Sequence, residues 1–210
     1  MGSNKRVSEA VIKRLPRYYR HLAILEVQGR ERISSEQLAR QMNLNASQVR
    51  QDFNCFGGFG QQGYGYNISS LLAEIRAILA IDRPHSLVVA GAGNIGRALT
   101  NFAGFEETGF HIEALFDVDP AAIGTTINGK PVLGMAELEE YIRAHDIDIG
   151  VIAARRSAAQ EIADVMIRAG VRGIWNFVPA DLATSVPTEN VHLSDSICAL
   201  SYKIAHGETE

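Results

Sequence analysis

Two glycine runs in the sequence could each bind the phosphates of a nucleotide. Residues 57–65 read GGFGQQGYG and residues 91–96 read GAGNIG, and both contain the spacing G-x-G-x-x-G. A loop of this kind admits a pyrophosphate to the start of a helix, and it needs a strand before it and a helix after it. The elements around each run therefore decide which of the two is a nucleotide loop.

The second run has the complete setting. An apolar segment at residues 87–90 predicts a strand, and a helix is expected to begin near Asn94. In such a loop Gly91 would allow the tight turn, Gly93 the close approach of a pyrophosphate, and Gly96 the packing of helix on strand. The residues predicted to form this loop are Gly91, Ala92, Gly93, Asn94, Ile95 and Gly96.

An acidic residue at the end of the next predicted strand strengthens this interpretation. Within HIEALFDVDP the strand ends at Asp117, 21 residues after Gly96. An acid at about this distance can accept hydrogen bonds from ribose hydroxyls and would repel the 2′-phosphate of NADP, so the sequence favours NAD. Asp119, in the same segment, is included in the predicted cofactor site. A methyltransferase loop for S-adenosylmethionine is the main competing interpretation.

The first glycine run lacks this setting, because it follows a predicted helix and is followed by YGYNISSLL. Its alternating aromatic and glycine residues favour a two-stranded ribbon with Gln61, Gln62 and Gly63 at the tip. After a helix-turn-helix such a ribbon is a wing, whose tip can enter a minor groove. The wing residues predicted to contact DNA are Gln61, Gln62 and Tyr64.

The segment before the wing predicts helices. Residues 8–29 contain an apolar stripe with helical spacing and therefore predict a helix. Pro16 would break or restart this helix. Ser34 with Gln37 three residues later is a capping box and predicts the start of a short second helix.

A third helix is expected to start at Asn45, which is again followed three residues later by a glutamine. Two short helices joined by a tight turn after a longer helix are typical of a helix-turn-helix, whose second short helix lies in the major groove. An ordinary three-helix bundle with a polar outer face is the alternative. The polar face predicted to read base edges carries Ser47, Gln48, Arg50, Gln51 and Asn54.

The charge of the chain is distributed unevenly. Of its 210 residues, the first 80 contain 11 Lys and Arg against 6 Asp and Glu, while residues 81–210 contain 9 against 18. A basic front and an acidic back suggest two units with different partners, and nucleic acid is the natural partner of the basic one. The two cysteines lack metal-ligand spacing, and neither a signal peptide nor a membrane span is expected, so we predict a cytoplasmic protein.

From about residue 82 onward, predicted strands alternate with predicted helices, which indicates a parallel doubly wound sheet. Arg155 and Arg156 end the fourth strand of this pattern, where they could contact cofactor phosphate, a partner subunit or only solvent. We find no nucleophile elbow, metal cluster or acid–base pair, and therefore predict neither catalytic residues nor a metal. A nucleotide domain without a substrate domain, attached to a DNA reader, suggests a sensor. The alternatives are an NAD-dependent oxidoreductase with an accessory N-terminal domain and a nucleotide-binding module for protein contacts.

With these motifs in view, the chain resembles the Rex family of bacterial redox-sensing transcriptional repressors. The segments that carry the resemblance, in order, are ISSEQLA, QVRQDF, FGGFGQQGYGY, GAGNIGRAL, FDVDP, AAQEIAD, AGVRGIWNFVPADL and SDSICALSY. The resemblance implies an α/β homodimer with an N-terminal winged helix (residues 1–80), a Rossmann domain (81–194) and a C-terminal helix exchanged between subunits (195–210). It also implies that the protein binds a palindromic double-stranded operator with NAD+ and is released from it by NADH.

The resemblance also assigns roles to single residues. Arg50 and the wing would contact DNA, and Phe102 and Phe105 would line the nicotinamide end of the cofactor. Asp195 matches a C-terminal acid that makes state-dependent contacts between subunits. Arg14 and Arg17 are candidate ion partners for it across the dimer.

The sequence departs from the usual family pattern at three places. Gln51 stands where a lysine is usual, and Gln61–Gln62 replace a basic pair, so both changes remove positive charge from the predicted DNA surface. Ala154–Arg155 replace a Val-Pro pair close to the nicotinamide, which bears on the preference between NADH and NAD+.

Overall fold

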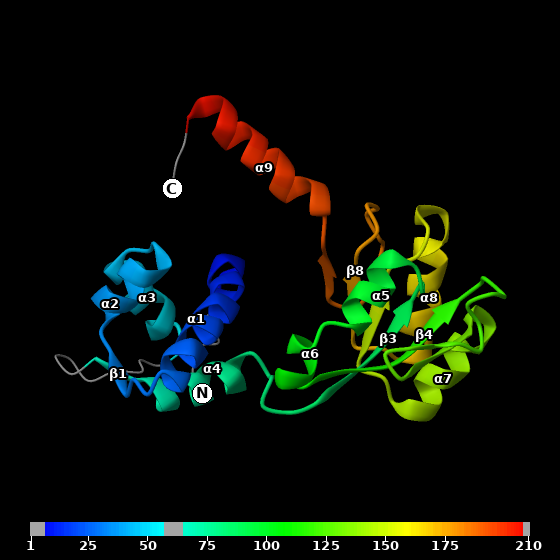
Figure 1. Cartoon of the computed structure of the whole chain (residues 1–210), viewed down its shortest axis with the longest axis horizontal. Coiled ribbons are helices and arrows are strands. Elements are labelled where there is room, and N and C mark those ends of the chain that lie inside the picture. The colour runs from blue at the N-terminus through cyan, green and yellow to red at the C-terminus, as the bar shows by residue number, and fades with distance from the viewer. Residues whose placement is uncertain (1–6, 57–64, 208–210) are drawn as a thin grey trace. The chain divides into compact units, whose positions relative to one another are not determined.

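The computed structural model describes residues 7–56 and 65–207 of the chain. The chain divides into two compact units, residues 1–83 and 84–210 (Figure 1). The predicted wing contacts Gln61, Gln62 and Tyr64 lie outside the described residues.

The N-terminal unit consists of helices around an apolar core, with a short pair of strands beside them. Its elements are α1 (Glu9–Val27), β1 (Arg32–Ile33), α2 (Ser35–Met42), α3 (Ala46–Asn54), β2 (Tyr66–Asn67) and α4 (Ile68–Ile78). The two strands pair antiparallel, with Ile33 opposite Tyr66. The ring of Phe53 lies between those of Tyr18 and Tyr66, with centroid separations of 4.9 and 5.1 Å. These contacts fix α3 against α1 and the strand pair.

The ends of these helices match the sequence only in part. The capping box at the start of α2 is confirmed, because the Gln37 N–H donates to Ser34 Oγ and the Ser34 N–H donates to Gln37 Oε1. The prediction of a break at Pro16 is wrong, since α1 continues through it. Pro16 lies on the exposed side of the helix, and the buried side chains of Leu15 and Tyr18 next to it pack into the core. This packing outweighs the intrinsic cost of an internal proline.

The C-terminal unit is built on a seven-stranded sheet with the order β5-β6-β4-β3-β7-β8-β9. The strands are β3 (His85–Ala90), β4 (Phe110–Asp117), β5 (Thr126–Ile127), β6 (Lys130–Gly134), β7 (Ile149–Ile152), β8 (Gly173–Asn176) and β9 (Thr188–Asn190). All neighbours pair in parallel except β5 and β6. The chain runs outward in opposite directions from β3, which has β4 on one side and β7 on the other. Ligands of open α/β sheets bind at such a switch point, outside the carboxyl ends of the strands.

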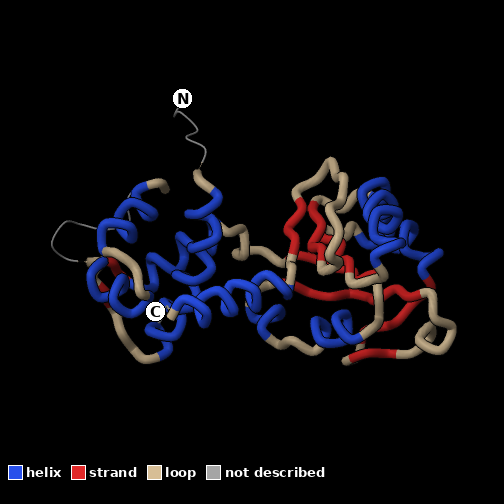
Figure 2. Tube along the Cα trace, turned by 90° about the horizontal axis from the view of Figure 1, so that it is seen from above, coloured by secondary structure: helices blue, strands red, loops and turns tan. Residues whose placement is uncertain are grey.

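Helices cover both faces of this sheet (Figure 2). They are α5 (Asn94–Thr100), α6 (Gly104–Glu107), α7 (Leu138–His145) and α8 (Ala159–Ala169), with short 3-10 turns η1 (Met135–Glu137) and η2 (Arg156–Ala158). Along β3, Val88 and Ala90 belong to the core under α7 and α8, whereas Leu87 and Val89 belong to the core on the opposite face. This alternation follows from the two-residue period of a strand. The predicted α/β fold with a doubly wound, mainly parallel sheet is confirmed.

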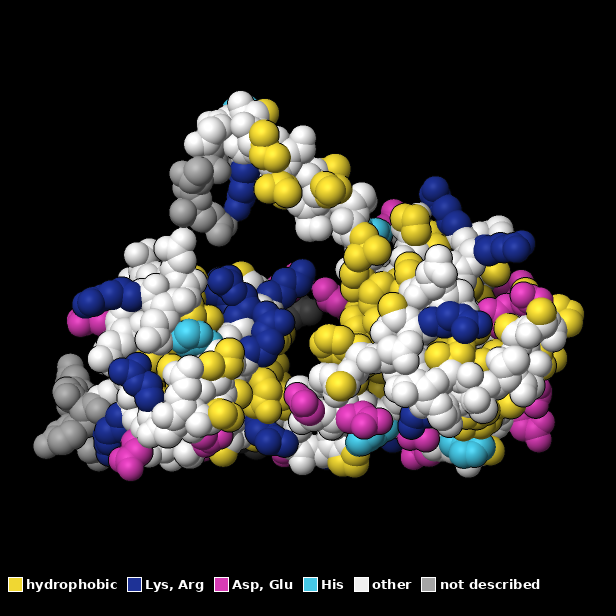
Figure 3. Space-filling model, in the orientation of Figure 1, with side chains coloured by type: hydrophobic (Ala, Val, Ile, Leu, Met, Phe, Trp, Pro, Cys, Tyr) yellow, Lys and Arg dark blue, Asp and Glu magenta, His cyan; other side chains and the backbone are white. Residues whose placement is uncertain are grey.

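The last helix, α9 (Leu193–His206), carries an exposed apolar surface. All fourteen of its residues are described and none is buried. Five large apolar side chains on it are between 53% and 74% exposed, and Figure 3 shows yellow side chains along the helix. They are Leu193, Ile197, Leu200, Tyr202 and Ile204.

Within the described residues, no helix has the length and apolar character that a membrane crossing needs. The same part of the chain holds no group of three or more His, Cys, Asp or Glu side chains suited to a metal ion.

Candidate functional site

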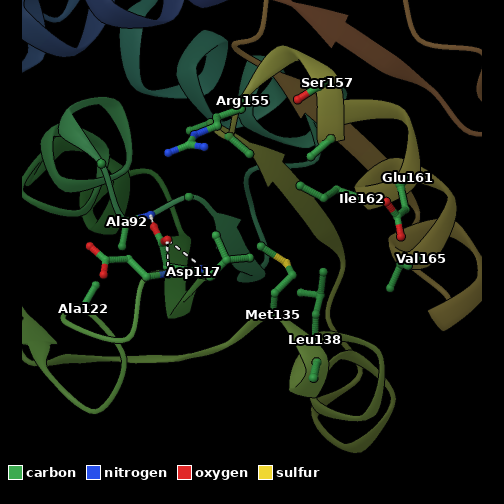
Figure 4. Close-up of a pocket in the computed structure, with 18 of the residues that line it drawn as sticks. Ala92, Asp117, Ala122, Met135, Leu138, Arg155, Ser157, Glu161, Ile162 and Val165 are labelled. Atoms are coloured by element: carbon green, nitrogen blue, oxygen red, sulfur yellow. Dashed lines mark hydrogen bonds between the residues drawn. The ribbon is translucent and has the colours of Figure 1, made fainter.

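A cleft of about 1240 Å³ opens in the C-terminal unit at the carboxyl ends of β3, β4 and β7 (Figure 4). One side is the glycine turn after β3, and the other sides come from the segments after β4, β6 and β7 and from α8. Its lining residues are Gly91, Ala92, Gly93, Arg97, Asp117, Val118, Asp119, Ala122, Met135, Ala136, Leu138, Ala153, Ala154, Arg155, Ser157, Ala158, Glu161, Ile162 and Val165.

The three glycines of the turn have different surroundings. Gly91 has a φ of +108°, and a Cβ at this position would meet the backbone oxygen of Ala153. A Cβ on Gly96 would meet the backbone oxygen of Gly91 and, at 3.3 Å, Val89 Cγ1. Only glycine fits at both positions, as the sequence predicts for a tight turn and for close helix–strand packing.

Gly93 is different, because no described atom beyond Gly93 itself and its neighbours in the chain lies within 4 Å of the place where its Cβ would be. Protein packing therefore does not require glycine there. A missing side chain beside open space instead leaves the backbone accessible to a ligand, and Gly93 lines the cleft. This fits the predicted close approach of a pyrophosphate.

Asp117 holds the glycine turn and the end of β4 together. Its Oδ2 accepts a hydrogen bond from the Ala92 N–H at 2.7 Å, and its Oδ1 accepts from the N–H groups of Val118 and Asp119 at 2.7 and 3.0 Å. Burial raises the pKa of this carboxyl, but the three N–H groups and the charge of Arg155 outweigh it and hold the pKa below its ordinary value. An ionised carboxylate offers about four acceptor positions, so one is left after these three bonds.

The cleft contains some of the predicted cofactor residues and not others. Gly91, Ala92, Gly93, Asp117 and Asp119 line it. Asn94, Ile95 and Gly96 form the start of α5 and do not line it.

The predicted aromatic pair also lies away from the cleft. Phe102 and Phe105 line a separate hollow of about 110 Å³ that includes Asn128. Their rings are 4.9 Å apart, and the ring of Phe105 is 5.6 Å from that of Trp175.

Sequence reasoning missed the apolar wall of the cleft and one of its cations. Met135, Leu138, Ile162 and Val165 form an apolar surface suited to a flat ring. The signal was present, since η1 follows β6 and α8 follows η2 beyond the end of β7, the places where such sheets bind ligands. Arg97, the missed cation, donates from Nε to the backbone oxygen of Ala92 at 2.9 Å.

In the N-terminal unit, α3 presents the predicted reading face, with one correction. Ser47, Arg50, Gln51 and Asn54 are exposed. Gln48 is only half-exposed, because its Nε2 donates to Asp52 Oδ1 at 2.7 Å, one helical turn further on. Helix α3 begins where the sequence predicts, with Asn45 at the N-cap position, but the Asn45 side chain makes no capping hydrogen bond. Arg50 donates to Ser35 Oγ at 3.1 Å, at the first residue of α2.

Asp52 is the centre of a buried polar cluster in this unit. Its side chain is fully buried, and Arg14 pairs with both of its oxygens, from Nε at 2.7 Å and from Nη2 at 2.8 Å. The Tyr18 hydroxyl donates to the same carboxylate at 2.8 Å. Burial alone would raise the pKa of Asp52, but the hydrogen bonds from Arg14, Tyr18 and Gln48 outweigh it and lower the pKa.

These contacts give Arg14 an ion partner within its own chain. The sequence suggested Arg14 as an ion partner of Asp195 in a second subunit. In the structure the guanidinium of Arg14 pairs with Asp52 of the same chain. Asp195 is exposed in the first turn of α9. Arg17, the other candidate, is exposed and makes one long contact, 3.5 Å from Nη2 to the backbone oxygen of Met42.

Comparison with known proteins places the whole chain in one family. Residues 6–54 match a family model described as a putative DNA-binding protein N-terminus, and residues 82–180 match one described as a CoA binding domain. The redox-sensing transcriptional repressor Rex of Clostridium beijerinckii is 48% identical over 211 residues, covering 100% of both chains. That of Clostridioides difficile is 47% identical, covering 99% of this chain and 100% of the relative. The chain belongs to the Rex family of redox-sensing transcriptional repressors.

Solved structures of Rex-family repressors agree with this assignment. RSP in complex with β-NAD+ and operator DNA is 44% identical, with a TM-score of 0.91 over 96% of this chain and 94% of that one. RSP in complex with β-NADH is 41% identical, with a TM-score of 0.89 over 97% and 96%. The family resemblance seen in the sequence motifs is thus confirmed. The names of these relatives favour a repressor over the oxidoreductase considered from the sequence.

Proposed function

We propose that this protein is a transcriptional repressor that binds operator DNA and senses the ratio of NADH to NAD+, with NADH releasing the DNA. The observation that carries the proposal is the combination of two sites on one chain. One unit presents the exposed polar face of α3, and the other holds a nucleotide-sized cleft with a glycine turn and an ionised aspartate. Rex-family relatives solved with operator DNA and with each redox form of the cofactor support it.

The cleft fits the adenine half of NAD(H). The open space at Gly93 leaves room for a pyrophosphate beside the backbone, and the remaining acceptor position on Asp117 can take a ribose hydroxyl. The apolar wall around Leu138 and Ile162 suits the adenine ring. When bound, the cofactor supplies the signal through its redox state, and this chain's residues bind and orient it. The ionised Asp117 disfavours a 2′-phosphate by charge repulsion, which selects NAD(H) over NADP(H).

The N-terminal unit would read DNA through α3. Ser47, Arg50 and Gln51 can donate or accept hydrogen bonds at base edges, and the basic residues of this unit attract the phosphate backbone. Figure 3 shows dark blue Lys and Arg side chains over its surface. Because Gln51 stands where the family usually has a lysine, Arg50 carries more of the charged contact with DNA.

We further propose that the protein acts as a homodimer on a palindromic operator. The exposed apolar residues of α9 need a surface to cover them, and a second copy of the chain, exchanging this helix, supplies one. A two-fold dimer presents two copies of α3, which fit half-sites about 34–36 Å apart or a multiple of this.

Coupling between the two sites follows from linkage. NADH can change DNA affinity only through different affinities for two arrangements of the dimer. The same coupling free energy requires operator DNA to weaken NADH binding by the factor by which NADH weakens DNA binding.

The test is a pair of titrations on the full chain. Fluorescence anisotropy measures the affinity for a labelled palindromic duplex with NADH, NAD+ or no nucleotide, and NADH fluorescence measures nucleotide affinity with and without saturating duplex. We expect NADH to weaken DNA binding more than NAD+ does, and the duplex to weaken NADH by a matching factor. Operator affinity that is equal in NADH and NAD+ would rule out the redox switch.

A further inference from the structure

Arg155 occupies a defined place on the edge of the cleft that the function above does not use. It follows β7 at its carboxyl end and immediately precedes η2. Its side chain is exposed and lines the cleft. Figure 4 shows the guanidinium extending over the cleft on the side of Ala92 and Asp117.

The backbone that carries Arg155 is fixed against the glycine turn. The Ala153 N–H donates to the Ala90 oxygen at 2.8 Å, and the Ala158 N–H donates to the Arg155 oxygen at 3.0 Å. The segment also approaches Gly91 so closely that a Cβ there would meet the oxygen of Ala153. The Arg155 side chain therefore starts from a position set relative to the turn, although the side chain itself can still rotate.

The Arg155 guanidinium differs from the other charged groups that line the cleft. The lining acids are Asp117, Asp119 and Glu161, and the lining cations are Arg97 and Arg155. Arg97 is bonded through Nε to the glycine turn itself. Within the described part of the chain, the Arg155 guanidinium has neither a hydrogen bond nor an ion pair of its own, while its charge acts on Asp117. Arg155 is therefore suited to bind an anion, because it lies over a turn whose backbone is accessible and has no protein partner among the described residues.

We propose that Arg155 binds the diphosphate of the nucleotide, with its guanidinium on the same side of the cleft as the glycine turn. A guanidinium presents a planar fork of N–H donors that matches the oxygens of a phosphate. The diphosphate is the anionic part of NAD(H), and the ionised Asp117 disfavours a phosphate on the adenosine ribose. The ligand class is therefore an adenosine 5′-diphosphate with a free ribose. This inference rests on the proposed function, because it assigns a contact within the same cleft.

The contact has a consequence for sensing. NADH and NAD+ carry the same diphosphate, so a contact to it adds equally to the affinity for both. This differs from the expectation from the family pattern, which put Arg155 close to the nicotinamide and let it affect the preference between the two forms. Loss of the side chain should shift the two affinities by one common factor and leave their ratio unchanged. With NADH as the only nucleotide present, release of the operator would then need a proportionally higher NADH concentration.

The experiment compares Arg155→Ala with Arg156→Ala by isothermal titration of the full chain. Arg156 is the matched control, because it is the neighbouring arginine, is exposed and does not line the cleft. The ligands are ADP, NADH, NAD+, NADPH and adenosine, which has no phosphate. We expect Arg155→Ala to weaken ADP, NADH and NAD+ about tenfold or more, which is about 1.4 kcal/mol, with adenosine unchanged. Arg156→Ala should match the native protein for every ligand, and Arg155→Lys should keep part of the ADP affinity.

Three results would overturn the assignment. ADP affinity unchanged in Arg155→Ala would show that the guanidinium does not bind the diphosphate. An equal loss for adenosine and ADP would mean that the substitution disturbs the cleft as a whole. A loss confined to NADPH would place the guanidinium at the ribose phosphate instead.

Failure of this inference and failure of the proposed function give different results. If the native protein binds NADH and NADH releases the operator, but Arg155→Ala binds ADP normally, only the role of Arg155 is wrong. If the native protein binds none of these nucleotides, the proposed function fails and this inference fails with it. If Arg155→Ala loses ADP as expected while NADH leaves operator binding unchanged, the contact is supported and the redox switch is refuted.

Discussion

Replacing Arg14 with alanine should destabilise the N-terminal unit strongly, because it leaves the Asp52 carboxylate buried without its countercharge. The side chain of Asp52 is 0% exposed and that of Arg14 is 22% exposed. Removing one partner of a buried ion pair costs about 3–5 kcal/mol. Two donors remain in the variant, Tyr18 at 2.8 Å and Gln48 at 2.7 Å, and the partial exposure of Arg14 lets water reach the vacated site. We therefore expect the lower end, about 3 kcal/mol of unfolding free energy.

The assay is urea unfolding followed by far-ultraviolet circular dichroism at neutral pH. With a slope of about 1–3 kcal/mol per molar urea, the midpoint should fall by about 1–3 M. Arg17→Ala is the matched control, because it removes an exposed arginine of the same helix that makes a single 3.5 Å contact. It should change the unfolding free energy by less than about 0.5 kcal/mol. Trp175 is the single tryptophan and lies in the C-terminal unit, so its fluorescence checks that this unit stays folded.

The pH dependence separates the charge effect from lost packing. In the native protein the pKa of Asp52 is lowered by folding. Its contribution to the unfolding free energy is therefore present above the unfolded pKa of about 3.9 and is lost as the pH falls through the folded pKa. In Arg14→Ala, fewer hydrogen bonds oppose the effect of burial, so the pKa of Asp52 should rise. Protonation of Asp52 should then recover part of the lost unfolding free energy. The difference in unfolding free energy between the native protein and Arg14→Ala should then become smaller as the pH approaches 4. A loss below about 1 kcal/mol at pH 7, or a gap that stays constant down to pH 4, would refute this reasoning.

The other predictions concern binding. Arg50→Ala should weaken operator binding by about 1–3 kcal/mol if this side chain reads a base, and unchanged anisotropy titrations with intact circular dichroism would remove it from the interface. Asp117→Ala should weaken NADH, because the glycine turn loses its bond to Ala92, and should narrow the gap between NADH and NADPH; equal affinity of the native protein for both nucleotides would contradict the selection argument. Asp195→Ala should reduce the mutual weakening of NADH and operator, which is typically 5–150-fold, and full retention of it would show that another residue relays the signal.

The features that the sequence predicted well are those decided by near neighbours. The capping box of Ser34 needs only Gln37, three residues away. The need for glycine at positions 91 and 96 follows from the geometry of a strand–turn–helix, and both positions are sterically closed to a side chain in the structure. The alternation of strands and helices likewise fixed the sheet, because a parallel pair needs a crossover connection.

The features that the sequence did not predict depend on distant parts of the chain. Arg14 is 38 residues from Asp52, so no local pattern indicates their ion pair. Gln48 is only four residues from Asp52, and this i, i+4 pair was overlooked when Gln48 was assigned wholly to DNA. Similarly, the apolar wall of the cleft combines Leu138 of α7 with Ile162 of α8, two helices that are separated in the sequence by β7 and pack into one core. Proline at position 16 looked like a break because propensity describes an isolated helix and not one packed on a core.

If α9 packs on a second copy of the chain, as proposed, the folding of this segment depends on protein concentration. A helix of fourteen residues is at the lower limit of what is stable alone in water, and most helical stability in proteins comes from packing. If a second copy provides the packing for Ile197 and Leu200, mass action governs whether residues 193–206 are helical at all. Dilution should then cost helical signal at 222 nm before either compact unit unfolds. The thermal midpoint should rise with concentration, so a melting curve describes this protein only together with the concentration at which it was recorded.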